Sequence, residues 1–181
     1  MAITNEREKI SRREMLKTSG AATFGAMLVV SGGIVACPRG AWAVQSKALA
    51  PESMATLIQM ARDIYPHDRL SDQFYVQAVA AHDEKAAGDK DFKRMMEKGV
   101  AGLDVAAQGK GAARYVDLGW EADRVAILRN IESSPFFQTV RGGLVTGIYN
   151  NQAVWPLFGY EGESASKGGY LNRGFDDIDW V

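Results

Sequence analysis

The residues best suited to chemistry in this sequence surround a histidine, in the segment Tyr65-Pro66-His67-Asp68. A histidine beside a carboxylate can act as a general base, and Asp63 or Asp68 could supply that carboxylate. No nucleophile motif such as G-x-S-x-G accompanies it. A structural role fits better, because a histidine at the C-terminal end of a helix interacts favourably with the helix dipole and Asp68 could cap the turn. A stand-alone enzyme that uses His67 with Asp63 or Asp68 is therefore an alternative function.

The other polar clusters in the sequence are weaker candidates for a functional site. A metal pair on a helix needs its second ligand three or four residues after the first, and after His82 these positions hold Lys85 and Ala86. The acidic residues at 176–179 lack the glycine and the closing glutamate of a calcium loop. One cysteine and two histidines exclude a Cys-rich metal site and a C-x-x-C-H haem motif. We expect no metal, no cofactor and no catalytic residue in this chain.

Composition and charge set further limits. The chain has 181 residues, 46% hydrophobic and 24% charged, which is typical of one globular domain with its own core. Its formal net charge of −1 argues against a protein that binds nucleic acid by neutralising phosphates.

Residues 1–43 have the parts of a twin-arginine export signal, in the expected order. An apolar stretch over 21–36 is diluted by glycine and is shorter than the roughly 20 residues of a spanning helix. Ala41-Trp42-Ala43 then forms an A-x-A cleavage site, which predicts cleavage after Ala43 and a periplasmic product. The residues of the export motif itself are Ser11, Arg12, Arg13, Leu16 and Lys17.

A competing interpretation concerns Cys37. The segment Ile34-Val35-Ala36-Cys37 resembles a lipobox, in which the cysteine is lipidated and becomes the new N-terminus. Pro38 and the downstream A-x-A site favour ordinary cleavage. The distinction matters because an acyl chain would anchor the protein to a membrane as a lipoprotein adaptor.

The elements that must position these residues are helices. Apolar residues at helical spacing, together with proline and glycine at the ends, predict helices over about 51–65, 71–87, 92–108, 120–132 and 135–149. No strand alternation or repeat is visible in this part of the chain. We therefore predict an all-α fold, a small bundle of about five helices spanning residues 44–149, with a linker before the first helix.

Residues 150–181 form a tail of different character. This tail is rich in glycine and holds 6 of the 17 aromatic residues, without helical or strand periodicity. Disordered tails are poor in aromatic residues, so the tail must bury its rings against its own bundle or against another protein. The proposed partner-interface residues are Trp155, Phe158, Tyr160, Tyr170, Arg173, Phe175, Asp176, Asp177 and Trp180.

Several segments together resemble the gluconate 2-dehydrogenase subunit 3 family. They are the twin-arginine leader, IYPHD at 64–68, LRNIESSPFF at 128–137, VWPLFGYEG at 154–162 and GGYLNRGFDDIDW at 168–180. The tail segments are the most specific of these, and the resemblance covers most of the chain after residue 43.

The resemblance implies a small subunit that accompanies a large FAD-dependent flavoprotein of the glucose–methanol–choline oxidoreductase type. Such complexes oxidise sugars, sugar acids or polyols, and a multihaem cytochrome c subunit often accepts the electrons. The small subunit commonly supplies the export signal for both proteins, so the twin-arginine translocase would be a further partner. No catalytic residue carries over, because the flavin chemistry of the family belongs to the large subunit.

Overall fold

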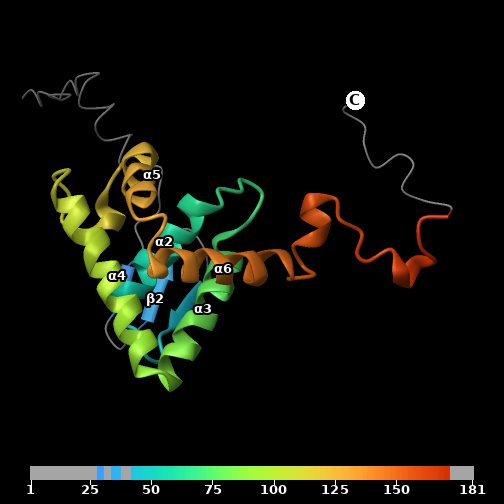
Figure 1. Ribbon diagram of the computed structural model, residues 1–181, viewed down its shortest axis with the longest axis horizontal. Helices are drawn as coiled ribbons and strands as arrows, with labels where there is room; N and C mark the ends of the chain where they lie inside the picture. The colour runs from blue at the N-terminus through green and yellow to red at the C-terminus, as the bar shows by residue number, and fades with distance from the viewer. Residues whose placement is uncertain (1–27, 31–33, 38–41, 172–181) are drawn as a thin grey trace, which may run out of the picture.

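The computed structural model describes residues 28–30, 34–37 and 42–171 (Figure 1). Its main body is a bundle of five α-helices, so the prediction of a small all-α bundle is confirmed. The observed ends lie within a few residues of the predicted ones. The helices are α2 (Pro51–Ile64), α3 (Asp72–Gly88), α4 (Lys90–Gln108), α5 (Glu121–Asn130) and α6 (Pro135–Tyr149).

The helix ends follow from local chemistry. Proline occupies the first turn of α2 and of α6, where its missing N–H costs nothing. The Ser134 hydroxyl accepts a hydrogen bond from the Phe137 N–H at 3.2 Å and caps α6. Asp89 caps α4 in the same way, accepting from the N–H groups of Asp91 and Phe92 at 3.0 and 2.9 Å.

The bundle core lies between α2, α3, α4 and α6, and α6 crosses the others close to α3 (Figure 1). Two glycines allow this close approach, because a Cβ on Gly143 would lie 2.3 Å from the His82 ring and one on Gly147 would lie 2.8 Å from Ala78 Cβ. The apolar stripe predicted for this helix is buried throughout. It consists of Phe136, Phe137, Val140, Leu144 and Ile148.

A small antiparallel sheet precedes the bundle, and its strands are β1 (Leu28–Val30), β2 (Ile34–Cys37) and β3 (Trp42–Gln45), paired in that order. The sheet falls in the segment that we interpret as the end of a leader, where β-branched residues favour extended structure. Cys37 ends β2, and Ala43, after which we expect cleavage, lies within β3. The arginine motif at 11–17 and Ala41 lie outside the described residues, so the leader stays a prediction.

The chain leaves the bundle at the end of α6 as an extended arm, which we define as residues 150–171. The arm contains two short 3₁₀ turns, η2 (Trp155–Phe158) and η3 (Ala165–Lys167), and projects away from the helices (Figure 1). Gly159 has a φ of 72°, a left-handed conformation that turns the chain directly after η2. Among the helices that the structure describes, none is both long and apolar enough to cross a membrane.

Candidate functional site

The carboxylate of Asp63 is buried in an ion pair and does not serve His67. Its two oxygens accept from Arg124 Nε at 3.1 and 2.9 Å, and one also accepts from the Tyr115 hydroxyl at 2.7 Å. Arg124 Nη1 donates to the Leu118 carbonyl at 2.6 Å, so the pair joins α2, α5 and the 3₁₀ turn η1 (Tyr115–Asp117). Burial first, and then the Asp63 charge, raises the pKa of Tyr115 far above its ordinary value. Asp63 and His67 therefore form no hydrogen bond with each other, and the predicted pairing of these two side chains is wrong.

His67 instead joins the bundle to the arm. Its Nε2 lies 2.8 Å from the hydroxyl oxygen of Tyr149, and the Phe158 ring stands edge-on to the imidazole at 4.8 Å. Burial raises the pKa of Tyr149, so its hydroxyl stays protonated near neutral pH. Asp68, the other proposed partner carboxylate, is exposed. The imidazole is therefore held between a tyrosine and a phenylalanine, and it lines a shallow surface pocket together with Asp68.

The main chain around His67 is fixed by a second tyrosine. Tyr75 of α3 accepts from the His67 N–H at 3.1 Å and donates to the Tyr65 carbonyl at 2.6 Å. One hydroxyl thus satisfies two backbone groups beyond the end of α2. These two hydrogen bonds hold the IYPHD segment as a corner between α2 and α3.

The cluster at His82-Asp83-Glu84 has a structural role. Asp83 accepts from three successive backbone N–H groups, those of Lys47, Ala48 and Leu49, at 2.6, 3.0 and 2.7 Å. These bonds hold the predicted linker against α3 as an ordered entry to α2. In the part of the chain that the structure describes, no group of three His, Cys, Asp or Glu side chains could hold a metal ion.

His82 itself is buried between α3 and α6. Its Nε2 has no hydrogen-bond partner among residues 45–171, and its ring faces Gly143. Burial lowers the pKa of this imidazole, with a smaller contribution from the nearby Lys85 charge. The neutral form of His82 is thus the one that the packed bundle accommodates.

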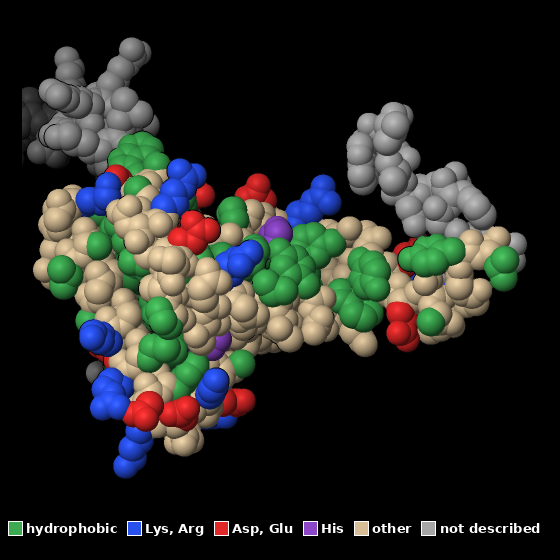
Figure 2. Space-filling model, viewed as in Figure 1, with side chains coloured by type: hydrophobic (Ala, Val, Ile, Leu, Met, Phe, Trp, Pro, Cys, Tyr) green, Lys and Arg blue, Asp and Glu red, His purple; other side chains and the backbone are tan. Residues whose placement is uncertain are grey.

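The base of the arm is packed against the bundle and the remainder is exposed. Val154 is fully buried, and the Trp155 indole N–H donates to the Tyr149 carbonyl at 2.7 Å. Phe158 is 40% exposed, Tyr160 51% and Tyr170 68%, although Tyr160 packs edge-on against Trp155 at 5.1 Å. Figure 2 shows hydrophobic side chains along the arm, outside the bundle. The other proposed interface residues, Arg173, Phe175, Asp176, Asp177 and Trp180, lie outside the described residues.

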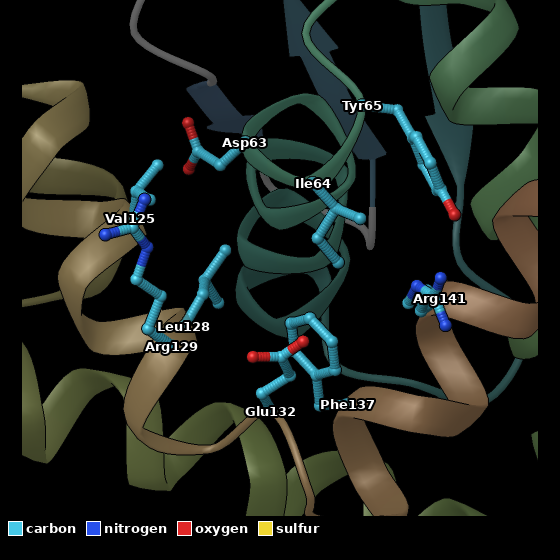
Figure 3. Close-up of a pocket in the computed structure, with 9 residues that line it drawn as sticks. All are labelled: Asp63, Ile64, Tyr65, Val125, Leu128, Arg129, Glu132, Phe137 and Arg141. Atoms are coloured by element: carbon cyan, nitrogen blue, oxygen red, sulfur yellow. The ribbon is translucent and has the colours of Figure 1, made fainter.

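Sequence reasoning missed a pocket on the bundle. A cavity of about 290 Å³ lies between the end of α2, helix α5 and the start of α6 (Figure 3). Ile64, Leu128 and Phe137 supply apolar walls, and the charged side chains at the opening belong to Arg129, Glu132 and Arg141. Tyr65 lines the same pocket.

The sequence analysis also did not predict the partners of Asp63 and His67, which are Arg124, Tyr115 and Tyr149. A signal exists for Arg124, which stands three and four residues before the buried Ile127 and Leu128 and so falls on an apolar face. A charged residue in that position indicates a buried counter-charge. Nothing comparable in the sequence indicates that Tyr149 would reach His67, since 82 residues separate them.

Comparison of the chain with family models, with curated proteins and with solved structures found no match. The resemblance to the gluconate 2-dehydrogenase subunit 3 family therefore stays a prediction from the sequence motifs.

Proposed function

We propose that this protein is the non-catalytic small subunit of a periplasmic FAD-dependent dehydrogenase complex that acts on sugars, sugar acids or polyols. In this proposal it escorts a glucose–methanol–choline type flavoprotein through the twin-arginine translocase and stabilises it afterwards. The flavoprotein carries the FAD, and a multihaem cytochrome c subunit is a further partner. The observation that carries the proposal is the arm, whose aromatic side chains extend away from the bundle core.

The arm is suited to binding a protein because it presents large rings on a chain that is held only at its base. Val154, Trp155 and Phe158 attach it to the bundle, whereas Tyr160, Tyr170 and Leu171 are 51%, 68% and 84% exposed. Exposed aromatic groups that gather in one place mark interaction sites, and buried Trp and Tyr dominate the energetics of interfaces.

Two of the candidate catalytic groups, Asp63 and His67, support the same conclusion, because each already has a structural partner. Asp63 binds Arg124 and Tyr115, and His67 contacts Tyr149 and Phe158. Asp83 binds the backbone of residues 47–49. These contacts give the carboxylates of Asp63 and Asp83 structural roles that do not require a catalytic one.

The first experiment isolates a C-terminally untagged, internally tagged full chain from the periplasm with whatever it binds. We expect one large polypeptide and the visible absorption spectrum of a flavin. A chain from which residues 159–181 are deleted should fold and lose that polypeptide, because the base of the arm stays in place. A colourless wild-type monomer would contradict the proposal.

The second experiment tests the escort role through the leader. Replacing Arg12 and Arg13 by lysine should leave both this protein and the flavoprotein in the cytoplasm. Arg7→Lys is the matched control, since it makes the same change in the leader outside the motif. Normal export of the flavoprotein in the Arg12/Arg13 variant would show that it does not depend on this chain.

The third experiment separates the proposal from the alternative enzyme. In the purified complex, His67→Ala removes the group that contacts Tyr149 and Phe158. We expect unchanged turnover per bound flavin and a weaker complex. A large loss of turnover in an intact complex with full flavin content would favour catalysis by His67.

A further inference from the structure

Two segments that the sequence analysis singled out meet at the pocket between α2, α5 and α6. Tyr65 and Ile64 come from the IYPHD segment, and Leu128 and Phe137 come from LRNIESSPFF. The pocket is also connected to the arm by a row of rings, because Tyr65 contacts Tyr149 and Tyr149 contacts Phe158, each with ring centroids 5.8 Å apart. The pocket and the exposed arm are thus joined by one aromatic strip.

The charges at the opening favour an anionic occupant. Arg129 and Arg141 approach the pocket from opposite sides with Glu132 between them (Figure 3). Neither guanidinium forms an ion pair with another residue in the part of the chain that the structure describes, whereas Arg94 and Arg114 each pair with an aspartate. Asp63 also lines the pocket, but Arg124 balances its charge. The opening therefore carries one net positive charge, which a single carboxylate would neutralise.

We propose that this pocket binds a carboxylate side chain, together with the apolar group next to it, from the flavoprotein subunit. This inference rests on the proposed function, and it extends the interface from the arm onto the bundle. Guanidinium groups bind carboxylates through paired, charge-assisted hydrogen bonds, and the apolar walls bury the adjoining group. A volume of about 290 Å³ suits one or two side chains and lies at the small end for a drug-sized ligand. Continuity with the arm favours a protein segment over a free metabolite.

The central test compares complexes that carry variants of this pocket. The double variant Arg129→Ala/Arg141→Ala should increase the dissociation constant of the flavoprotein about tenfold or more, measured by dilution and light scattering. Arg94→Ala is the matched control, because Arg94 is exposed and does not line the pocket. Dissociation equal to that of wild type in the double variant would overturn the inference and leave the arm interface standing.

A variant of Glu132 distinguishes an anionic occupant of the pocket from a cationic one. Replacing it by glutamine removes the negative charge at the opening without changing its size, so Glu132→Gln should tighten the complex several-fold if the occupant is a carboxylate. A cationic occupant would bind Glu132 and the same variant would weaken the complex. A weaker complex therefore overturns the assignment.

A small probe tests the pocket without the partner. 3-Phenylpropionate titrated into the full chain should shift the NMR signals of Tyr65 and Phe137 in a saturable manner, and the neutral 3-phenylpropanamide should bind about tenfold more weakly. The double arginine variant should abolish this difference, whereas deletion of 159–181 should leave it unchanged. Equal binding of both probes to the wild type overturns the carboxylate assignment. If the wild-type chain isolated from the periplasm carries no flavoprotein, both the proposed function and the proposed occupant of the pocket are wrong. Tight carboxylate binding by such a chain would then identify the pocket as a metabolite site.

Discussion

Helix α6 and the arm follow one another along the chain, but the phenylalanines of the helix are buried and the aromatic residues of the arm are largely exposed. In α6, Phe136 and Phe137 are 6% and 7% exposed, while in the arm Tyr160 and Tyr170 are 51% and 68% exposed. The difference lies in periodicity. A helix returns every third or fourth side chain to the same face, so one face can be buried along its whole length. The arm has no such period, and beyond Gly159 its rings leave the bundle.

The contacts that stabilise the fold therefore lie in the bundle and at the base of the arm, whereas the arm beyond Gly159 contributes few of them. The bundle contains the buried ion pair, the close helix contacts and the apolar core, so changes there should alter the free energy of unfolding. Beyond Gly159 the arm contributes few contacts to the fold, so changes there should leave the free energy of unfolding almost unchanged and, in our proposal, weaken partner binding.

Removing the buried cation should damage the bundle most. Arg124→Ala leaves the Asp63 carboxylate buried without its counter-charge, and we expect a loss of about 3–5 kcal/mol in the free energy of unfolding. Arg94→Ala, which removes an arginine from an exposed pair, should cost about 0–1 kcal/mol. Urea unfolding of both variants measures the difference. Equal costs would mean that the buried pair does not organise the bundle.

Substitutions at two adjacent glycines in α6 should change the free energy of unfolding in opposite directions. Gly143→Ala places a methyl group 2.3 Å from the His82 ring, and overpacking of this kind costs about 1–3 kcal/mol. Gly142→Ala meets no atom within 4 Å and should stabilise the helix by about 0.5–1 kcal/mol. Thermal unfolding distinguishes the two. A stabilising Gly143→Ala would show that α3 and α6 are less closely packed than described.

Acid should weaken the bundle through His82. Burial lowers the pKa of this imidazole in the folded protein, so below about pH 6.5 the unfolded chain takes up a proton that the folded chain resists. The contribution of His82 to the free energy of unfolding is fully present above that pH. It declines as the pH falls, by up to about 1.4 kcal/mol per pH unit. His82→Leu should remove this part of the slope between pH 7.5 and 5. An unchanged slope would exclude His82 as its source.

The smallest effect on stability is expected in the arm. Tyr170→Ser removes a ring that is 68% exposed, and the free energy of unfolding should change by less than about 0.5 kcal/mol. The same substitution should reduce flavoprotein retention clearly, because aromatic anchors dominate interfaces. Calorimetry and pull-down of one preparation give both values. A destabilised monomer with normal retention would reverse the roles of arm and bundle.

The sequence alone determined the local structure of this protein. Proline at the start of α2 and of α6, the Ser134 cap and the apolar stripe of α6 all act within one or two helical turns, so their spacing predicts the helices directly. The change of composition after residue 149 likewise predicted where the bundle would end. The three short strands were not predicted, because an apolar run diluted by glycine fits a leader as well as a small sheet.

The contacts between side chains of different helices could be read only from the tertiary structure. Asp63 and His67 are neighbours in sequence, but the turn at the end of α2 sends the first towards Arg124 and the second towards Tyr149. Asp83 binds a segment 34 to 36 residues away, and the pocket combines Tyr65 with Arg141. Such contacts depend on how whole helices pack, and packing is set by the sum of many weak apolar contacts that no local spacing records.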